Sequence, residues 1–158
     1  MVGGGLGMGL GRGLFFEGLV CLHGADCSTR PFKQMRPAQG FRDLKTYQKA
    51  RKQARYIFEL TQRFPKEETY SLTDQIRRSS RAVGALLAEA WARRRYEAAF
   101  VNKVNQALGE AMETQSWLDA AHDCGYIDAD AHDALDTEWQ RIGGKLHRMI
   151  QESDRFCS

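Results

Sequence analysis

The stretch that decides the fold is LTDQIRRSSRAVGALLAEA, residues 72–90. At about 100° per residue, its main apolar side chains fall within one narrow arc of a helical wheel. They are Leu72, Ile76, Val83, Leu87 and Ala90. Arg77, Arg78 and Arg81 lie away from that arc, so we expect them to face solvent or a partner. The stretch therefore predicts an amphipathic helix that buries one face in a core.

The residues before this stretch indicate where the helix begins and where an earlier helix ends. Ser71 stands at the expected N-cap, with Asp74 three residues later as its capping-box partner. The Phe64-Pro65 pair ends the earlier segment, because the residue before proline is driven out of the α region. That segment begins after Phe41, and we expect one buried face made of Leu44, Tyr47, Ala54, Phe58 and Thr61.

Two further helices are predicted towards the C-terminus. The first runs from about Tyr96 to Cys124, ends at Gly125 as a C′ residue, and has its main stripe at Phe100, Val104, Ala107, Ala111 and Leu118. Val101, Leu108 and Met112 form a second flank, with Trp117 on the other side. This wide apolar arc suits either two covering neighbours within one bundle or a subunit interface.

The last helix is expected to begin at Asp128 or Asp130. Its stripe is Ala131, Leu135, Trp139, Ile142, Leu146 and Met149, with Gly143-Gly144 as a weak point where the helix can bend. No segment alternates like a strand, and the connections are short. The sequence therefore predicts an all-α, antiparallel up-down-up-down four-helix bundle over residues 41–152, with 153–158 as a tail.

Residues 1–40 have a different composition from the rest of the chain. They hold 10 of the 15 glycines and 2 of the 3 prolines, which predicts a disordered Gly-rich extension. Met35 stands six residues before the periodic region, so a start codon assigned too far upstream would explain residues 1–34. A membrane span needs about 20 predominantly apolar residues. The sequence offers none, so no membrane partner is expected.

The formal net charge of +3 conceals a division of the chain. Arg42 to Lys103 carries a net charge of +8, whereas Val104 to Ser158 carries −7. If the first two helices of one subunit met the last two of the next, the opposite charges would attract. Such a heterologous contact closes into a ring when the rotation permits.

The basic residues of the first two helices also suggest a nucleic-acid interface. Exposed Lys and Arg along a face make phosphate contacts that give affinity without sequence choice. The candidates are Lys45, Lys49, Lys52, Arg55, Arg77, Arg78, Arg81, Arg93, Arg94 and Arg95. Tyr47 and Tyr96 would add stacking on unpaired bases, although Tyr47 also suits a core position. The competing interpretation is an ordinary solvated surface paired with acidic neighbours.

An enzyme has little support in the sequence. A ferritin-like di-iron bundle needs two Glu-x-x-His pairs, and this chain offers Asp119-x-x-His122 once. No Ser, Cys or His stands in a nucleophile–base arrangement. We therefore expect no catalytic residue, metal or cofactor. Four cysteines, Cys21, Cys27, Cys124 and Cys157, have irregular spacing that favours a reducing, cytoplasmic setting over a disulfide framework.

Three quoted stretches resemble one known family: FRDLKTYQKA from residue 41, FPKEETYSLTDQIRRSSRAVGALLAEA from residue 64, and YEAAFVNKVNQALGEAMETQSWLDAAHDCGYID from residue 96. Their order and spacing are similar to the four-helix-bundle proteins of 23S ribosomal RNA intervening sequences, over about residues 41–152. Gln75-Ile76-Arg77-Arg78, Ala88-Glu89 and Glu113 match the family pattern. Ala90 departs from it, because the family usually has glycine there.

The resemblance implies a non-enzymatic protein that forms a homo-oligomeric ring, commonly a pentamer. A related branch comprises accessory proteins of diversity-generating retroelements, which bind nucleic acid and a reverse transcriptase. Expected oligomer or partner contacts are Glu89, Val101, Leu108, Met112, Glu113 and Trp117. RNA is the leading partner class, and the alternative is a protein–protein adaptor or scaffold with no nucleic-acid role.

Overall fold

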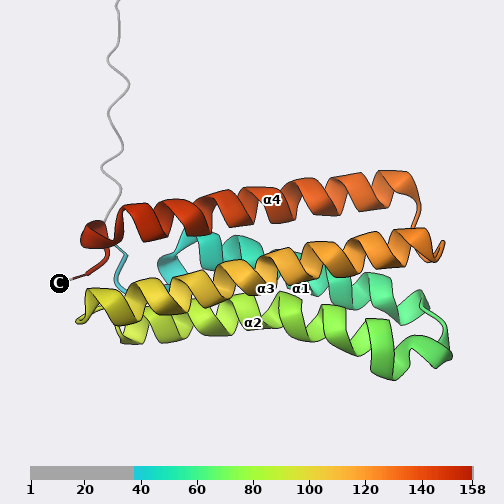
Figure 1. Cartoon of the computed structure of the whole chain (residues 1–158), viewed down its shortest axis with the longest axis horizontal. Helices are drawn as coiled ribbons and strands as arrows, with labels where there is room; N and C mark the ends of the chain where they lie inside the picture. The colour runs from blue at the N-terminus through green and yellow to red at the C-terminus, as the bar shows by residue number, and fades with distance from the viewer. Residues whose placement is uncertain (1–37, 158) are drawn as a thin grey trace, which may run out of the picture. The chain divides into compact units, whose positions relative to one another are not determined.

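The computed structural model describes residues 38–157, which form a bundle of four long helices (Figure 1). These helices are α1 (Lys45–Leu60), α2 (Asp74–Ala92), α3 (Glu97–Asp123) and α4 (Ala129–Gln151). Short helical turns flank them: η1 (Phe41–Asp43), η2 (Thr61–Arg63), η3 (Lys66–Glu68), η4 (Thr69–Thr73) and η5 (Ser153–Arg155). The predicted N-terminal extension lies almost wholly outside the described residues, as do Cys21 and Cys27.

Consecutive helices run antiparallel, which gives the up-down-up-down topology (Figure 1). Helix α1 packs against α2 and α4, and α3 packs against the same two helices from the other side. This arrangement confirms the predicted all-α four-helix bundle. No helix within the described residues combines the length and apolar character needed to cross a membrane.

The core contains the apolar stripes predicted for α2 and α3 and most of the stripe predicted for α4. Ile76, Phe100, Trp139 and Leu146 are among its fully buried side chains. The wide apolar arc of α3 is largely covered within its own chain, because Val101, Leu108 and Trp117 pack against the core. In α4, Ala131 and Leu135 are only half-buried, and the helix continues through Gly143 and Gly144.

The buried face of α1 differs from the predicted one. Its buried residues are Thr46, Ala50, Gln53 and Ile57, whereas Tyr47 and Ala54 are half-buried and Phe58 is 38% exposed. Tyr47, Ala54 and Phe58 each stand one position after a buried residue, so the true face is rotated by about 100° there, whereas Leu44 and Thr61 are buried as predicted. The prediction was wrong because it favoured large aromatic side chains over small and polar ones, which the core accepts here.

The start of α2 also differs from the prediction. Glu68, and not Ser71, caps the helical run, because its carboxylate accepts from the backbone N–H of Leu72 at 3.4 Å. Ser71 lies inside the π-helical turn η4 and donates its hydroxyl hydrogen to Glu68. The hydrogen bonds from Ser71 and Tyr126 lower the pKa of Glu68. The hydrogen bond from the Leu72 N–H to the Glu68 carboxylate therefore replaces the predicted capping box of Ser71 and Asp74.

The connection between α3 and α4 follows the predicted chemistry. Gly125 has φ +72°, and its N–H donates to the carbonyl of His122 at 2.8 Å. The next N–H, of Tyr126, donates to the carbonyl of Ala121 at 2.9 Å. These two bonds form a Schellman motif. Asp128 then caps α4 by accepting from the N–H of Ala131 at 2.8 Å.

Side-chain packing continues beyond residue 152 into the segment predicted as a tail. Ser153 is buried and donates to Glu97 Oε1 at 2.5 Å. The ring of Phe156 stacks on that of Phe100, with centroids 5.7 Å apart. The last described residues therefore cover the end of the bundle where α3 begins.

Candidate nucleic-acid interface

A surface groove runs between α1 and α2, and we call it the α1–α2 groove. Its volume is about 530 Å³, and its lining residues are Phe41, Tyr47, Arg51, Ala54, Arg55, Phe58, Ser80, Arg81, Gly84, Ala85 and Ala88. Aromatic side chains come from the α1 side, and α2 contributes small residues. Three arginines line the groove, and none of its described lining residues is acidic. The groove therefore combines apolar surface with a positive charge of +3.

The groove exists because α1 turns its aromatic residues outward. Tyr47 and Phe58 lie on the side of α1 that faces α2, beside rather than within the core. Gly84 of α2 lies next to Tyr47, and a Cβ there would be in ordinary van der Waals contact with the Tyr47 ring at 3.5 Å. Phe41 meets Tyr47 edge to face, with ring centroids 5.0 Å apart. Tyr47 and Phe58, which were predicted to lie in the core, thus form the α1 wall of the groove.

Two arginines of α2 lie over the ring of Phe58. The guanidinium carbons of Arg77 and Arg81 are 4.9 Å and 5.4 Å from its centroid. Arg77 is held in place, because its Nε donates to Thr61 Oγ1 at 2.7 Å. Thr61 in turn donates to the carbonyl of Ile57 at 2.7 Å. Cation–π contacts of this kind are worth about 0.5–1 kcal/mol at exposed sites.

The α1 side of the groove continues onto a second basic hollow. This hollow is lined by Arg42, Tyr47, Gln48, Arg51, Lys52 and Arg55. Arg55 forms an ion pair with Glu59 at 2.8 Å, and the hydrogen bond of that pair raises the pKa of Arg55. Because Arg55 and Glu59 are both largely exposed, such a pair is weak and opens easily.

The ten predicted nucleic-acid residues do not form one continuous face. Arg55 and Arg81 line the α1–α2 groove, and Arg77 lies over the ring of Phe58, which lines the same groove. Lys49 turns towards α4 and pairs with Glu138 at 3.1 Å, whereas Lys52 lines both the hollow on that side and the basic hollow beside the groove.

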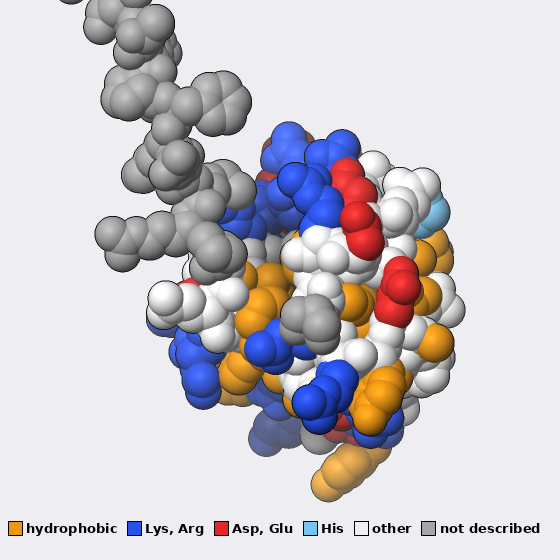
Figure 2. All heavy atoms as spheres, turned by 90° about the vertical axis from the view of Figure 1, so that its left-hand side faces the viewer, with side chains coloured by type: hydrophobic (Ala, Val, Ile, Leu, Met, Phe, Trp, Pro, Cys, Tyr) orange, Lys and Arg blue, Asp and Glu red, His pale blue; other side chains and the backbone are white. Residues whose placement is uncertain are grey.

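The remaining candidates lie elsewhere on the bundle. Lys45 is exposed at the start of α1, and Arg78 acts electrostatically on Glu110 of α3. Arg93, Arg94 and Arg95 lie at the α2–α3 connection, where Arg94 covers the Trp91 ring at 4.4 Å. Figure 2 looks at this end of the bundle, where Lys and Arg side chains alternate with exposed apolar ones.

Arg51 is the groove residue that sequence reasoning missed. It lies one turn after Tyr47 and one turn before Arg55, on the same side of α1. That spacing was readable in the sequence. Tyr47 was predicted to lie on the buried face of α1, and Arg51, which shares the groove side with Tyr47, was therefore not predicted as a site residue.

The predicted oligomer contacts are mostly engaged within the chain. Glu89 pairs with Lys103 of α3 at 2.8 Å, and that hydrogen bond lowers the pKa of Glu89. Glu113 accepts from Trp117 Nε1 at 3.1 Å. Met112 is the exception, because its side chain is 60% exposed.

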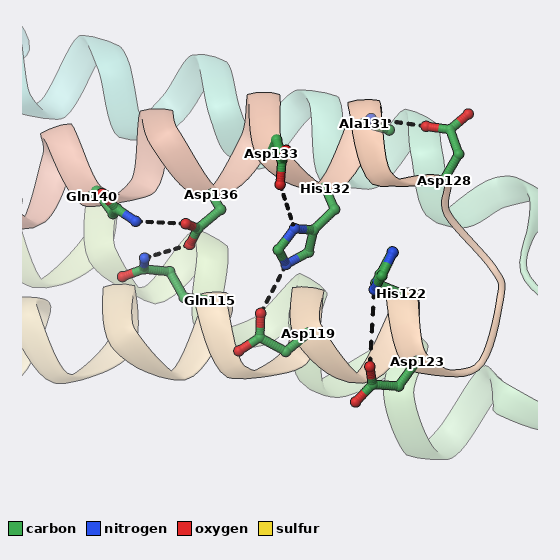
Figure 3. A network of polar contacts seen from close by, with 10 residues as sticks. All are labelled: Gln115, Asp119, His122, Asp123, Asp128, Ala131, His132, Asp133, Asp136 and Gln140. Atoms are coloured by element: carbon green, nitrogen blue, oxygen red, sulfur yellow. Dashed lines mark hydrogen bonds and ion pairs between the residues drawn. The ribbon is translucent and has the colours of Figure 1, made fainter.

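A polar network joins α3 to α4 at the end of the bundle where α3 ends and α4 begins (Figure 3). The His132 ring lies between Asp119, at 2.8 Å from Nε2, and Asp133, at 3.2 Å from Nδ1. These hydrogen bonds, that of Asp119 foremost, raise the pKa of His132. The His122 ring lies 5.1 Å from the His132 ring. Within residues 38–157, no cluster of His, Cys, Asp and Glu has a metal-holding arrangement. The contact of Asp119 with His132 joins α3 to α4, and we call it the helix–helix clamp.

These features define a small helical-bundle protein with an arginine-lined groove between its first two long helices. The chain belongs to the family described as 23S rRNA-intervening sequence protein, whose model matches residues 42–148. This match confirms the resemblance carried by the three quoted stretches.

A solved structure with a similar fold is that of a protein of unknown function from the S23 ribosomal protein family of Bacteroides thetaiotaomicron VPI-5482. It is 29% identical, with a TM-score of 0.61, and the match covers 67% of this chain and 95% of that chain. A comparison with curated proteins found no match.

Proposed function

We propose that this protein is a non-enzymatic, homo-oligomeric RNA-binding protein of the cytoplasm that holds RNA in the α1–α2 groove. The observation that carries the proposal is the lining of that groove, with Arg51, Arg55 and Arg81 and no carboxylate among its described residues. Phosphate contacts need such exposed cations along a surface. The family's name, which refers to ribosomal RNA, directs the proposal to RNA.

Binding of an anionic polymer in the groove would break few interactions that the arginines already make. Within the described part of the chain, Arg51 and Arg81 make no hydrogen bond or ion pair, so a phosphate would displace no strong partner. Arg55 would give up only the exposed pair with Glu59, and exposed ion pairs contribute little to stability. Binding through these groups is electrostatic and therefore weakens as salt rises.

Self-association is the second part of the proposal. The family resemblance implies a ring, commonly a pentamer. A different hollow, which we call the α1–α4 hollow, offers apolar surface for contact between subunits. This hollow lies between α1 and α4, has a volume of about 660 Å³, and contains Tyr56, Leu60 and Leu135. Light scattering at micromolar concentration should give a mass several times that of one chain. A monomer would refute this part.

The RNA-binding part is tested by titrating a fluorescent structured RNA at several salt concentrations. The test variant carries Arg51→Gln, Arg55→Gln and Arg81→Gln. A matched control removes the same charge at exposed positions outside the groove: Arg63→Gln, Lys66→Gln and Arg148→Gln.

Each lost phosphate contact lowers the slope of log K against log salt by about 0.7–0.9. The groove variant should therefore lose about 2 from the magnitude of the slope, and the control much less. Equal losses in both variants would place binding outside the groove. No binding by the wild type at low salt would refute the RNA-binding function.

The alternative function is a protein–protein adaptor or scaffold without a nucleic-acid role. The observation that favours it is the apolar α1–α4 hollow, where Tyr56 is 47% exposed. Purification without a high-salt wash separates the two functions. An oligomer with a protein-like absorbance ratio and no retained RNA favours the adaptor, whereas co-purified RNA favours the proposed function.

A further inference from the structure

We infer that the α1–α2 groove takes an unpaired base of single-stranded or bulged RNA, stacked against the ring of Phe58. The inference rests on the proposed RNA binding and names the part of an RNA that this groove would recognise. It depends on how Phe58 is presented, on the two guanidinium groups beside it, and on the small residues of α2.

Phe58 presents an aromatic ring to solvent at a position where a core residue was expected. The side chain is 38% exposed, and it lines the groove together with Arg81. Every base has a π-face, so stacking on such a ring is tolerant of sequence. An exposed ring within a positively charged groove is therefore suited to stacking an unpaired nucleotide.

The two arginines over this ring are held differently. Arg77 is fixed by its 2.7 Å bond to Thr61 Oγ1, and Thr61 is only 3% exposed. Arg81 has no hydrogen bond or ion pair to any described residue, and it touches Phe58 only as a cation over the ring at 5.4 Å. Arg81 can therefore leave the ring to meet a phosphate and free the part of the ring that it covers for a base, while Arg77 stays over the ring and keeps Phe58 in place.

The α2 side of the groove provides space of a suitable size. Gly84, Ala85 and Ala88 line it with little more than backbone and methyl groups, within a volume of about 530 Å³. A paired base is stacked between its neighbours, and side chains cannot read the deep, narrow major groove of an A-form duplex. A duplex would thus reach only the arginines, whereas an unpaired base can also enter the hollow.

An acidic peptide would also be attracted to the three arginines, but it would gain little from the flat ring of Phe58. The combination of stacking surface and positive charge favours a nucleotide over a carboxylate side chain. We therefore commit to RNA and use an acidic peptide as a competitor in the test.

The test compares an unstructured RNA oligonucleotide with a blunt duplex of the same length, using wild type, Phe58→Leu and a control. Tyr70→Leu is the matched control, because Tyr70 is 91% exposed and lies outside the groove. The variant Phe58→Leu keeps an apolar side chain and removes the π-face. Circular dichroism establishes that both variants are folded.

Stacking of one base is worth about 1–3 kcal/mol, which corresponds to a fivefold or greater change in affinity. Phe58→Leu should weaken single-strand binding at least fivefold, with duplex binding and the salt slope unchanged. Tyr70→Leu should change neither. In wild type, a 2-aminopurine base in the oligonucleotide should be quenched on binding, a readout that does not depend on the variant folding.

Three results would overturn the inference. Equal binding of single strand and duplex, unaffected by Phe58→Leu, would show phosphate contact alone and leave the proposed RNA binding intact. Displacement of the RNA by an equimolar acidic peptide would show that charge, and not the base, is recognised. Failure of both RNAs to bind would refute the proposed function itself.

Discussion

Gly84 lies in the middle of α2, where glycine is about 1 kcal/mol less favourable than alanine. The structure does not require glycine for packing, because a Cβ there would lie 3.5 Å and 3.8 Å from two carbons of the Tyr47 ring. These are ordinary van der Waals separations. Gly84→Ala should therefore stabilise the fold by about 0.5–1 kcal/mol through the backbone term.

For a domain of this size, a gain of that magnitude raises Tm by about 2–5 °C. Thermal unfolding followed by circular dichroism measures it. Gly109→Ala is the matched control, because Gly109 is an exposed glycine of α3 with nothing within 4 Å of its Cβ position. Both variants should gain similar stability, since both replace a helical glycine without a clash.

A larger residue at Gly84 tests the groove itself. Gly84→Leu would project into the space beside Tyr47, so RNA binding should fall at least fivefold, while Gly109→Leu leaves it unchanged. A loss of stability in Gly84→Ala alone would refute the reasoning about space. Unchanged RNA affinity in a folded Gly84→Leu variant would refute the role of the groove.

Three further predictions concern the fold, each measured by urea unfolding. Gly125→Ala should cost about 1–2 kcal/mol, because φ +72° is strained for any residue with a Cβ; an unchanged midpoint would contradict the motif. Asp128→Ala should cost about 1 kcal/mol by removing the cap of α4, and a cost near zero would show that the cap does not act. Hydrogen bonds raise the pKa of His132, so its charged clamp contributes fully below about pH 6.5 and is lost as pH rises through the folded-state pKa. Asp119→Asn should therefore cost about 0.5 kcal/mol more at about pH 5.5 than at about pH 8.5, and an equal cost at both would contradict that sign.

The sequence predicted α2, α3 and α4 well because the main apolar stripe of each is the one that the core contains. Ile76 stands on a stripe with few large apolar rivals, and the extra apolar residues of α3 extend the stripe of Phe100; both residues are fully buried. The Gly125 terminus was equally readable, because a glycine after a long periodic segment predicts a left-handed C′ residue. These helix faces and the Gly125 terminus depend on residues that are close together in the sequence, so the sequence alone predicts them.

Helix α1 could not be predicted in the same way. It has apolar residues on two adjacent faces, and the face that contains Gln53 and Ile57 is the one that packs into the core. Only the positions of α2 and α4 decide between such faces. That choice also determined the candidate site, since it placed Tyr47 and Phe58 in the groove and made Arg51 their neighbour.

The central claim is that RNA lies in the α1–α2 groove. The most direct measurement is photocrosslinking of a bound RNA containing 4-thiouridine, followed by mass spectrometry of the modified peptides. We predict crosslinks to the α1 segment that contains Tyr47 and Phe58, lost when Arg51, Arg55 and Arg81 are replaced by glutamine. Crosslinks confined to the α2–α3 connection at Arg93–Tyr96, under conditions where the RNA is fully bound, would contradict the claim.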